Sequence, residues 1–265
     1  LIASKFGGIP YLKEGDTHPF CNSCKNPLTL FVQINLDTIK KEVKDCFGIY
    51  EGMVQFFYCS DDCVQDDIYF NLSKEEYINK GEKFKVSQFI RYIESKEINP
   101  NIKNELTEKI EDVTIFPEII IYDWEYMGYE YPYEYGELGD ISEDSTFKIT
   151  KEKKYTEKLP QSFIDFFLER EDVIEDFNVY TEDEDRVDCL LMCYFVYQGN
   201  KIGGNPSWVQ LPNEFKCFDC DKNLSIVMQI NSEDNIPFMF NDGGRGHIYM
   251  CKEHKNMSLF HYDCG

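Results

Sequence analysis

The chain has 265 residues and carries 27 lysines and arginines against 49 aspartates and glutamates, so its formal net charge is −22. Because nucleic acid and anionic membranes are themselves negative, this charge argues against both as partners and favours a basic protein or peptide. A hydrophobic content of 42% excludes wholesale disorder, and no apolar run approaches the ~20 residues of a membrane-spanning helix.

The start of the chain and its cysteines bear on the compartment. Leu1 to Gly8 contain no charged region followed by an apolar stretch, so no signal peptide is predicted. The 11 cysteines are an odd number that cannot pair entirely into disulfides, and several stand in close pairs. Such pairs bind metal more often than they form disulfides in a reducing environment, so we expect a cytoplasmic, intracellular protein.

Two segments of the chain repeat each other without a gap. Residues 5–35 read KFGGIPYLKEGDTHPFCNSCKNPLTLFVQIN, and residues 201–231 read KIGGNPSWVQLPNEFKCFDCDKNLSIVMQIN. The shared Gly-Gly-x-Pro, Cys-x-x-Cys and Gln-Ile-Asn predict an internal duplication with two similar halves. In each half they predict a turn, a tight knuckle and then a β-strand, over Leu28–Ile34 and Leu224–Ile230.

Each of these predicted strands contains one glutamine, Gln33 or Gln229. We expect a buried amide that satisfies the backbone of the neighbouring half, because an unpaired buried amide is costly. A ligand-binding glutamine is the alternative.

The spacing of cysteines and one histidine predicts two structural zinc ions. Each candidate site joins a Cys-x-x-Cys pair to a second close pair about thirty residues further on. The candidate ligands are Cys21, Cys24, Cys59 and Cys63 in the first half, and Cys217, Cys220, Cys251 and His254 in the second. Four such ligands suit tetrahedral Zn²⁺ and leave no open position for catalysis. Cys264 is an alternative to His254, and thiols without metal or a redox pair are alternatives to the sites.

The segment between the repeats mixes helical, extended and acidic stretches. We expect a helix that starts at Ser73–Glu76, further helices at Ser87–Glu97 and Lys158–Glu169, and a strand within Ile115–Glu125. A very acidic stretch follows from Glu169 to Asp185. The middle of the chain therefore holds much of the excess negative charge.

A tract from Glu125 to Glu137 alternates tyrosine with acid and predicts a surface loop. Aromatic rings and carboxylates together hold cationic side chains, by cation–π contacts and ion pairs. Candidate partner-binding residues are Tyr126, Tyr129, Tyr131, Tyr133, Glu134 and Tyr135. The alternative is a solvated loop whose tyrosines pack locally.

Residues 232–249 have no counterpart in the first half of the sequence. We expect a turn at Asn241–Gly246 between two strands, Phe238–Phe240 and His247–Cys251. Asp242 and His247 are the one acid and histidine close together near a glycine turn, so they form a candidate catalytic pair. Satisfied structural groups in a hairpin are the alternative.

These motifs together resemble a known family. Lys201-Ile202-Gly203-Gly204-x-Pro206, Gln229 to Asn235, Phe240 to Gly244 and Cys251-x-x-His254 resemble the YwqG-like family, a domain of unknown function. The front half, with Lys5-Phe6-Gly7-Gly8-x-Pro10 and Gly52 to Cys59, also resembles the related programmed cell death protein 2 family. The resemblance implies a mostly β, duplicated fold with α additions, and in the second family a dedicated chaperone of a basic ribosomal protein.

The sequence as a whole predicts an α+β, mainly β fold with two similar zinc-stapled β halves. The expected domains are a first zinc-binding repeat at 1–70, a central insertion at 71–195 and a second zinc-binding repeat at 196–265. The expected function is that of a non-enzymatic, zinc-stabilised module whose acidic surface binds a basic protein, in a chaperone-like or toxin-neutralising role. The alternative is a hydrolase-like enzyme near Asp242 and His247, or one that uses His261.

Overall fold

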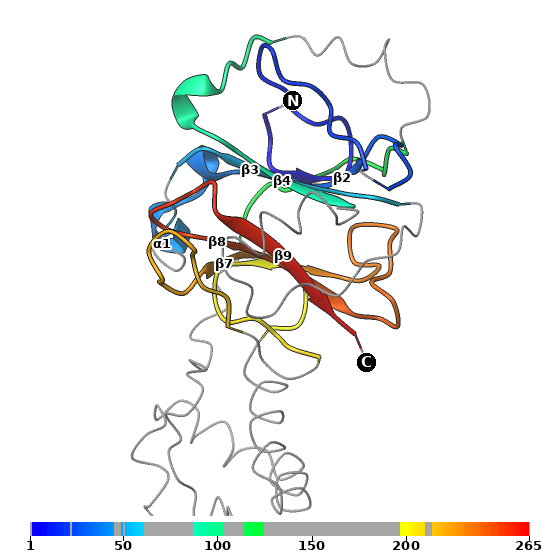
Figure 1. Cartoon of the computed structure of the whole chain (residues 1–265). Helices are drawn as coiled ribbons and strands as arrows, with labels where there is room; N and C mark the ends of the chain where they lie inside the picture. Colours follow the sequence, from blue (N-terminus) through cyan, green and yellow to red (C-terminus); the bar gives the residue numbers. More distant parts are fainter. Residues whose placement is uncertain are drawn as a thin grey trace, which may run out of the picture. The chain divides into compact units, whose positions relative to one another are not determined.

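The computed structural model describes residues 2–21, 23–44, 49, 51–60, 87–102, 114–124, 197–209 and 214–264 (Figure 1). The chain divides into two compact units, one made of Leu1–Gly128 with Gln198–Gly265 and the other of Tyr129–Tyr197. Several predicted features lie outside the described residues. They are the helices at Ser73–Glu76 and Lys158–Glu169, the Tyr/acid tract and the acidic stretch Glu169–Asp185.

The first sheet is antiparallel and has the strand order β4-β3-β2-β1-β5. Its long strands β2, β3 and β4 are marked in Figure 1. The bounds of the five strands are Lys5–Phe6 (β1), Thr29–Asn35 (β2), Met53–Tyr58 (β3), Gln88–Ile93 (β4) and Ile119–Ile120 (β5).

The second sheet is also antiparallel and has the order β6-β7-β8-β9. Its strands are Lys201–Ile202 (β6), Ser225–Asn231 (β7), Arg245–Met250 (β8) and Ser258–Asp263 (β9). The described residues therefore confirm a mainly β fold, with helices limited to α1 (Lys41–Lys44) and the 3-10 turns η1 (Leu36–Thr38) and η2 (Ser95–Glu97).

Four strands of the first sheet, β1 to β4, agree in their registers with the four strands of the second sheet, while β5 is an addition to the first. Lys5 pairs with Gln33 in the first sheet as Lys201 pairs with Gln229 in the second. Both second strands carry a register shift, between Leu30 and Val32 in β2 and between Ile226 and Met228 in β7. Strands β3 and β4 correspond in the same way to β8 and β9.

The hydrophobic core lies between the two sheets. Alternate residues of a strand point to opposite faces, so each sheet has an inner face toward the other sheet and an outer face. Phe56 of β3 stacks on Phe260 of β9, with ring centroids 4.2 Å apart, and Phe31 of β2 packs against Phe238 at 5.0 Å. Both faces of β3 are buried, because loops cover the outer face as well. This explains the near-continuous apolar run of that strand.

The Gly-Gly pairs before the first turns are needed for backbone conformation and for space. Gly7 and Gly8 have φ angles of 58° and 70°, a region that side chains disfavour. A Cβ atom on Gly7 would lie 2.5 Å from the carbonyl oxygen of Pro117. The Lys5 ammonium, which is 1% exposed, binds the Glu118 carboxylate at 2.7 Å. The glycine pair therefore lets the segment before β5 cross close to β1.

Three predictions of local structure are wrong or too long. Ser87–Glu97 is not a helix, because Gln88–Ile93 forms β4 along the whole of β3 and η2 follows. Phe238–Phe240 forms no strand, since the Ser232 hydroxyl donates to Gly244 and accepts from the Phe240 N–H, which holds a loop. The strand predicted in Ile115–Glu125 is limited to Ile119–Ile120.

Strands β4 and β5 come from the range predicted as the central insertion and are part of the first sheet. Strand β8 lies in a segment with no recognised counterpart in the sequence, yet it takes the place that β3 has in the first sheet. Among the residues that the structure describes, no helix has the length and apolar character needed to cross a bilayer.

Candidate metal centres

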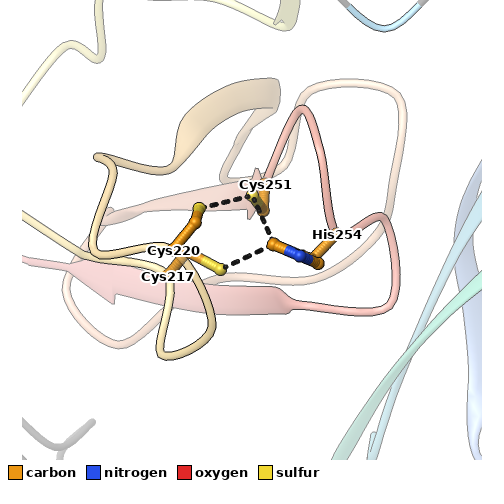
Figure 2. Close-up of side chains that lie close together, drawn as sticks. All are labelled: Cys217, Cys220, Cys251 and His254. Atoms are coloured by element: carbon orange, nitrogen blue, oxygen red, sulfur yellow. Dashed lines mark hydrogen bonds between the residues drawn. The ribbon is translucent and has the colours of Figure 1, made fainter.

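Three cysteines and one histidine of the second sheet converge at one point (Figure 2). The Cys220 and Cys251 sulfurs are 3.7 Å apart, and Nδ1 of His254 lies 3.5 Å from Cys217 Sγ and 3.7 Å from Cys251 Sγ. All four ligand atoms lie within 4.8 Å of one another. The structure thus brings together the four residues predicted for the second site.

These distances fit the geometry of one bound ion. Zn–S bonds of about 2.3 Å and Zn–N bonds of about 2.05 Å at tetrahedral angles place two sulfurs ~3.8 Å apart and a sulfur and a nitrogen ~3.6 Å apart. The separations of Cys220 from Cys251 and of Cys217 from His254 match these values. The group can therefore accept a tetrahedral ion with little rearrangement, with His254 binding through Nδ1.

The Cys-x-x-Cys knuckle is the tip of a tight hairpin. Lys216 and Asn223 form a bridge at its base, and the Cys217 N–H donates to the Lys222 carbonyl oxygen. Asp221 completes the turn with a φ of 58°. This short return of the chain makes Cys217 and Cys220 face the same point.

The other two ligands come from a second hairpin, between β8 and β9. Cys251 follows β8 directly, and its N–H donates to the Met257 carbonyl oxygen, while the Met257 N–H donates to that of His254. His254 therefore occupies the turn itself. An ion held by both hairpins would join the start of β7 to the end of β8.

Charged contacts surround this site. Lys222 of the knuckle forms an ion pair with Glu253 of the hairpin, so the two hairpins are also joined by opposite charges. Lys255, next to the histidine ligand, donates to the Tyr92 hydroxyl of β4 at 2.9 Å and lies over its ring at 5.0 Å. The hairpin therefore also touches the first sheet.

The thiols of the site hold protons unequally. A hydrogen bond from the Lys222 backbone lowers the pKa of Cys220, but burial and the neighbouring thiols outweigh it and raise that pKa to about 11. Burial raises the pKa of Cys251, but hydrogen bonds from the backbone of His254 and Glu253 outweigh it and lower that pKa to about 7. A cation at the centre would favour the thiolate form of each sulfur, because it supplies the missing opposite charge.

The first sheet carries a matching group of three cysteines. Cys21, Cys24 and Cys59 lie together, and the sulfurs of Cys24 and Cys59 are 3.7 Å apart. The knuckle repeats the second one, with a bridge between Phe20 and Pro27. The fourth predicted ligand, Cys63, lies outside the described residues.

The alternative ligand of the second site is placed elsewhere. The group contains His254 and not Cys264, whose sulfur accepts from the Asn241 amide at 3.7 Å. The candidate partner-binding residues Tyr126, Tyr129, Tyr131, Tyr133, Glu134 and Tyr135 lie outside the described residues.

The two strand glutamines are buried amides with matching contacts. The Tyr11 N–H donates to Gln33 Oε1 at 2.9 Å, and Gln33 Nε2 donates to the Ala3 carbonyl oxygen at 2.9 Å. In the second sheet Ser207 and Gly199 make the same contacts with Gln229. Among the described residues, the backbone groups that these amides satisfy belong to their own half, whereas the neighbouring half was expected.

Asp242 and His247 have different surroundings. Asp242 is exposed in the turn before β8, whereas His247 is fully buried on the outer face of the second sheet. The carboxylate next to His247 is that of Asp263, with Oδ1 3.8 Å from Nδ1. The sequence did not indicate this contact, because Asp263 reaches it through the pairing of β9 with β8.

The model of a family described as a domain of unknown function, DUF1963, matches residues 4–262. No curated protein matches the chain.

Proposed function

The chain belongs to this DUF1963 family, and we propose that it is a non-enzymatic, zinc-stabilised module that binds a basic protein or peptide. The observation that carries the zinc part is the group Cys217, Cys220, Cys251 and His254, whose ligand atoms all lie within 4.8 Å of one another and include three pairs at 3.5 to 3.7 Å. The role is structural, because four protein ligands leave no open position for a water or a substrate.

Zinc is the ion that this ligand set favours. Thiolate and imidazole ligands at tetrahedral separations suit Zn²⁺, whereas Mg²⁺ and Ca²⁺ need six or more oxygens. Zinc requires deprotonated, reduced thiols, so we propose a reducing intracellular compartment for the protein.

The first site is proposed to hold a second zinc ion with Cys63 as its fourth ligand. The support is the equivalence of the two knuckles and of Cys59 with Cys251, each of which directly follows the second long strand of its sheet. We further propose that the two sheets arose by an internal duplication, since the order, registers and register shifts of β1 to β4 match those of β6 to β9. This agrees with the proposed resemblance to the YwqG-like and programmed cell death protein 2 families and with repeats at 1–70 and 196–265.

The proposed partner follows from charge. The chain carries −22, and acidic residues crowd the stretches Tyr122–Asp144 and Glu169–Asp185. Opposite charge speeds association and selects basic partners, and tyrosines beside carboxylates add cation–π contacts. We therefore assign partner binding to the central segment, with Tyr126, Tyr129, Tyr131, Tyr133, Glu134 and Tyr135 as its candidate contacts. The role would be chaperone-like or neutralising.

Metal analysis of the purified chain tests the zinc part. We expect two zinc ions per chain by mass spectrometry, and one in Cys220→Ser and in Cys63→Ser. Cys264→Ser is the matched control, because Cys264 is a thiol of the same half that lies outside the metal group, and it should retain two. Fewer than two ions in the wild type, or loss of one in Cys264→Ser alone, would contradict the proposed ligand sets.

Binding of a defined peptide tests the partner part. A fluorescent Lys/Arg-rich peptide should bind in an anisotropy assay at ~50 mM salt, and ~0.5 M salt should weaken that binding by tenfold or more, since salt screens exposed charges. A peptide of equal length with Gln in place of Lys and Arg is the control. Equal binding of both peptides would refute the electrostatic part. Replacement of the five candidate tyrosines by alanine should weaken binding of the basic peptide if the central tract contacts it.

A further inference from the structure

Two histidines and an aspartate are buried together on the outer face of the second sheet. His247 of β8 lies directly opposite His261 of β9, and Asp263 follows two residues later on the same face. Their exposed fractions are 0%, 6% and 3%. The segment Ser207–Val209 covers this cluster, with the Trp208 ring 5.0 Å from that of His247 and 5.7 Å from that of His261.

The hydrogen bonds of the cluster hold the cover in place. His247 Nε2 donates to Gln229 Oε1 at 3.2 Å, and the same oxygen accepts the Ser207 N–H at 2.8 Å. Asp263 Oδ2 accepts the Val209 N–H at 2.5 Å. The amide of Gln229 and the carboxylate of Asp263 thus anchor the two ends of the covering segment.

The charges around His247 oppose a positive imidazole. Among the described residues, the titratable or charged groups that face it are Lys201 from β6, Arg245 and Tyr249 from β8, and His261 and Asp263 from β9. The single carboxylate already binds the cover and lies 3.8 Å from Nδ1, beyond hydrogen-bond distance. Two cations and a second imidazole therefore disfavour a proton on His247, and one aspartate favours it.

The first sheet carries other residues at the three corresponding positions. Gln55 and Arg91 are paired there as His247 and His261 are paired in the second sheet, and Ile93 takes the place of Asp263. Gln55 Nε2 donates to Gln33 Oε1 at 2.8 Å, so it makes the same strand-to-strand contact without a group that titrates. The first sheet has Arg91 paired with Asp16 at this place, so two paired histidines beside an aspartate are found, within the described residues, in the second sheet alone.

We propose that His247, His261 and Asp263 form a proton-operated lock, which holds the segment Ser207–Val209 closed while both imidazoles are neutral and releases it when they take up protons. Opening would expose the Trp208 ring and the outer face of β8 and β9. The device goes beyond the proposed binding function and does not depend on it.

The direction and range of the switch follow from the buried state of the two rings. Burial, then His261, Lys201 and Arg245 hold the pKa of His247 well below its usual range, against a weaker opposing hydrogen bond with the Ser207 backbone. Burial lowers the pKa of His261 to about 4. Groups with a lowered folded-state pKa of this kind stabilise the closed form above pH ~6.5 and lose that effect as the pH falls toward 4. For His261 alone, a shift from 6.5 to about 4 favours the open form on the order of 30-fold at pH 5.

Trp208 offers a local readout. The chain has two tryptophans, so Trp124→Phe leaves Trp208 as the single tryptophan, which can be excited selectively beside the tyrosines. We expect its emission to shift to longer wavelength between pH 6.5 and 4.5, in buffer with excess zinc. His247→Gln places the residue of the first sheet at this position, and together with His261→Gln it should reduce the acid-induced opening at pH 5 by tenfold or more. His18→Gln, a buried histidine of the first half, is the matched control and should leave the Trp208 transition unchanged.

Three results would overturn the lock. One is a wild-type emission that stays constant down to pH 4.5, and another is an equal transition in the double variant. The third is a shift that follows zinc release, recorded with a metal indicator in the same samples, equally in all variants. If the double variant fails to fold, amide hydrogen exchange of Val209 in the wild type decides: after correction for intrinsic exchange rates its protection must fall between pH 6.5 and 5, and unchanged protection refutes the proposal.

Discussion

The substitution Gln33→Leu tests whether the buried amide is a structural fastening of the first sheet. Leucine keeps much of the side-chain volume but can neither donate nor accept a hydrogen bond. Within the described part of the chain, the Gln33 side chain makes hydrogen bonds with the Tyr11 N–H, the Ala3 carbonyl oxygen and the Gln55 amide, at 2.8 to 2.9 Å. All three partner groups would lose this contact at once.

The magnitude follows from which partners remain buried without another contact. Tyr11 is 0% exposed, so its N–H would be left unpaired at a cost of about 1–3 kcal/mol. The Gln55 amide retains the Tyr11 carbonyl oxygen at 2.7 Å, and the Ala3 oxygen is only partly buried, so each adds less. The sum is ~2–5 kcal/mol, which corresponds to ~5–15 °C in the melting temperature of a chain of this size.

Chemical and thermal denaturation of the purified chain measure this loss, and Gln229→Leu in the second sheet should behave in the same way. Gln88→Leu on β4, a glutamine that is only half buried, is the control and should change stability by about 0.5 kcal/mol or less. A loss below ~1 kcal/mol in Gln33→Leu would refute the reasoning. So would an unchanged stability combined with loss of peptide binding, because that result would make Gln33 a ligand-binding residue.

Gly52→Ala should destabilise the chain by about 2 kcal/mol or more, because Gly52 has a φ of 90° and a Cβ atom there would lie 2.5 Å from the Ile93 carbonyl oxygen. Gly15→Ala is the control, since Gly15 has a similar φ but open space around it, and it should cost only ~1 kcal/mol in thermal or chemical denaturation. Phe56→Ala and Phe260→Ala should each cost ~3–5 kcal/mol, and a double-mutant cycle should give a coupling of ~0.5–1.5 kcal/mol if the two sheets share one core. Burial lowers the pKa of His18, so the wild type should lose stability relative to His18→Gln as the pH falls below 6.5, measured by melting at pH 7.5 and 5.

Local chemistry explains what could be predicted from the sequence. A Cys-x-x-Cys knuckle needs only a few residues, so its turn and the strand after it can be predicted without the rest of the fold. The paired spacing then predicted the group around Cys217 and His254, which the structure brings together. Glycines with positive φ at Gly7 and Gly203 likewise followed from local sequence.

The wrong predictions concern elements whose conformation depends on distant partners. Gln-Phe-Ile-Arg-Tyr-Ile has no strict alternation, and it is a strand because six consecutive residues of β4 pair with β3. Strand β9 was not predicted, although it completes the second sheet and supplies His261 and Asp263. The buried cluster around His247 was invisible for the same reason, since strand pairing, and not closeness in sequence, assembles it.

Each half is held by a cysteine group and by a buried glutamine amide. The two act on different strands, so one does not replace the other. The cysteine group joins the hairpin before the second strand to the end of the third, as Cys24 and Cys59 do in the first sheet. The buried amide instead holds the segments that flank β1, a strand of two residues whose two register pairs with β2 are a weak attachment. A metal ion at the cysteine group would not hold β1, and the buried amide does not hold the ends of the hairpins.

In the second half the protonatable cluster lies on the side of the amide, around Gln229 and the segment Ser207–Val209 that it anchors. Acid and metal removal should therefore open the second sheet at different places, the first at Ser207–Val209 and the second at the hairpin of His254.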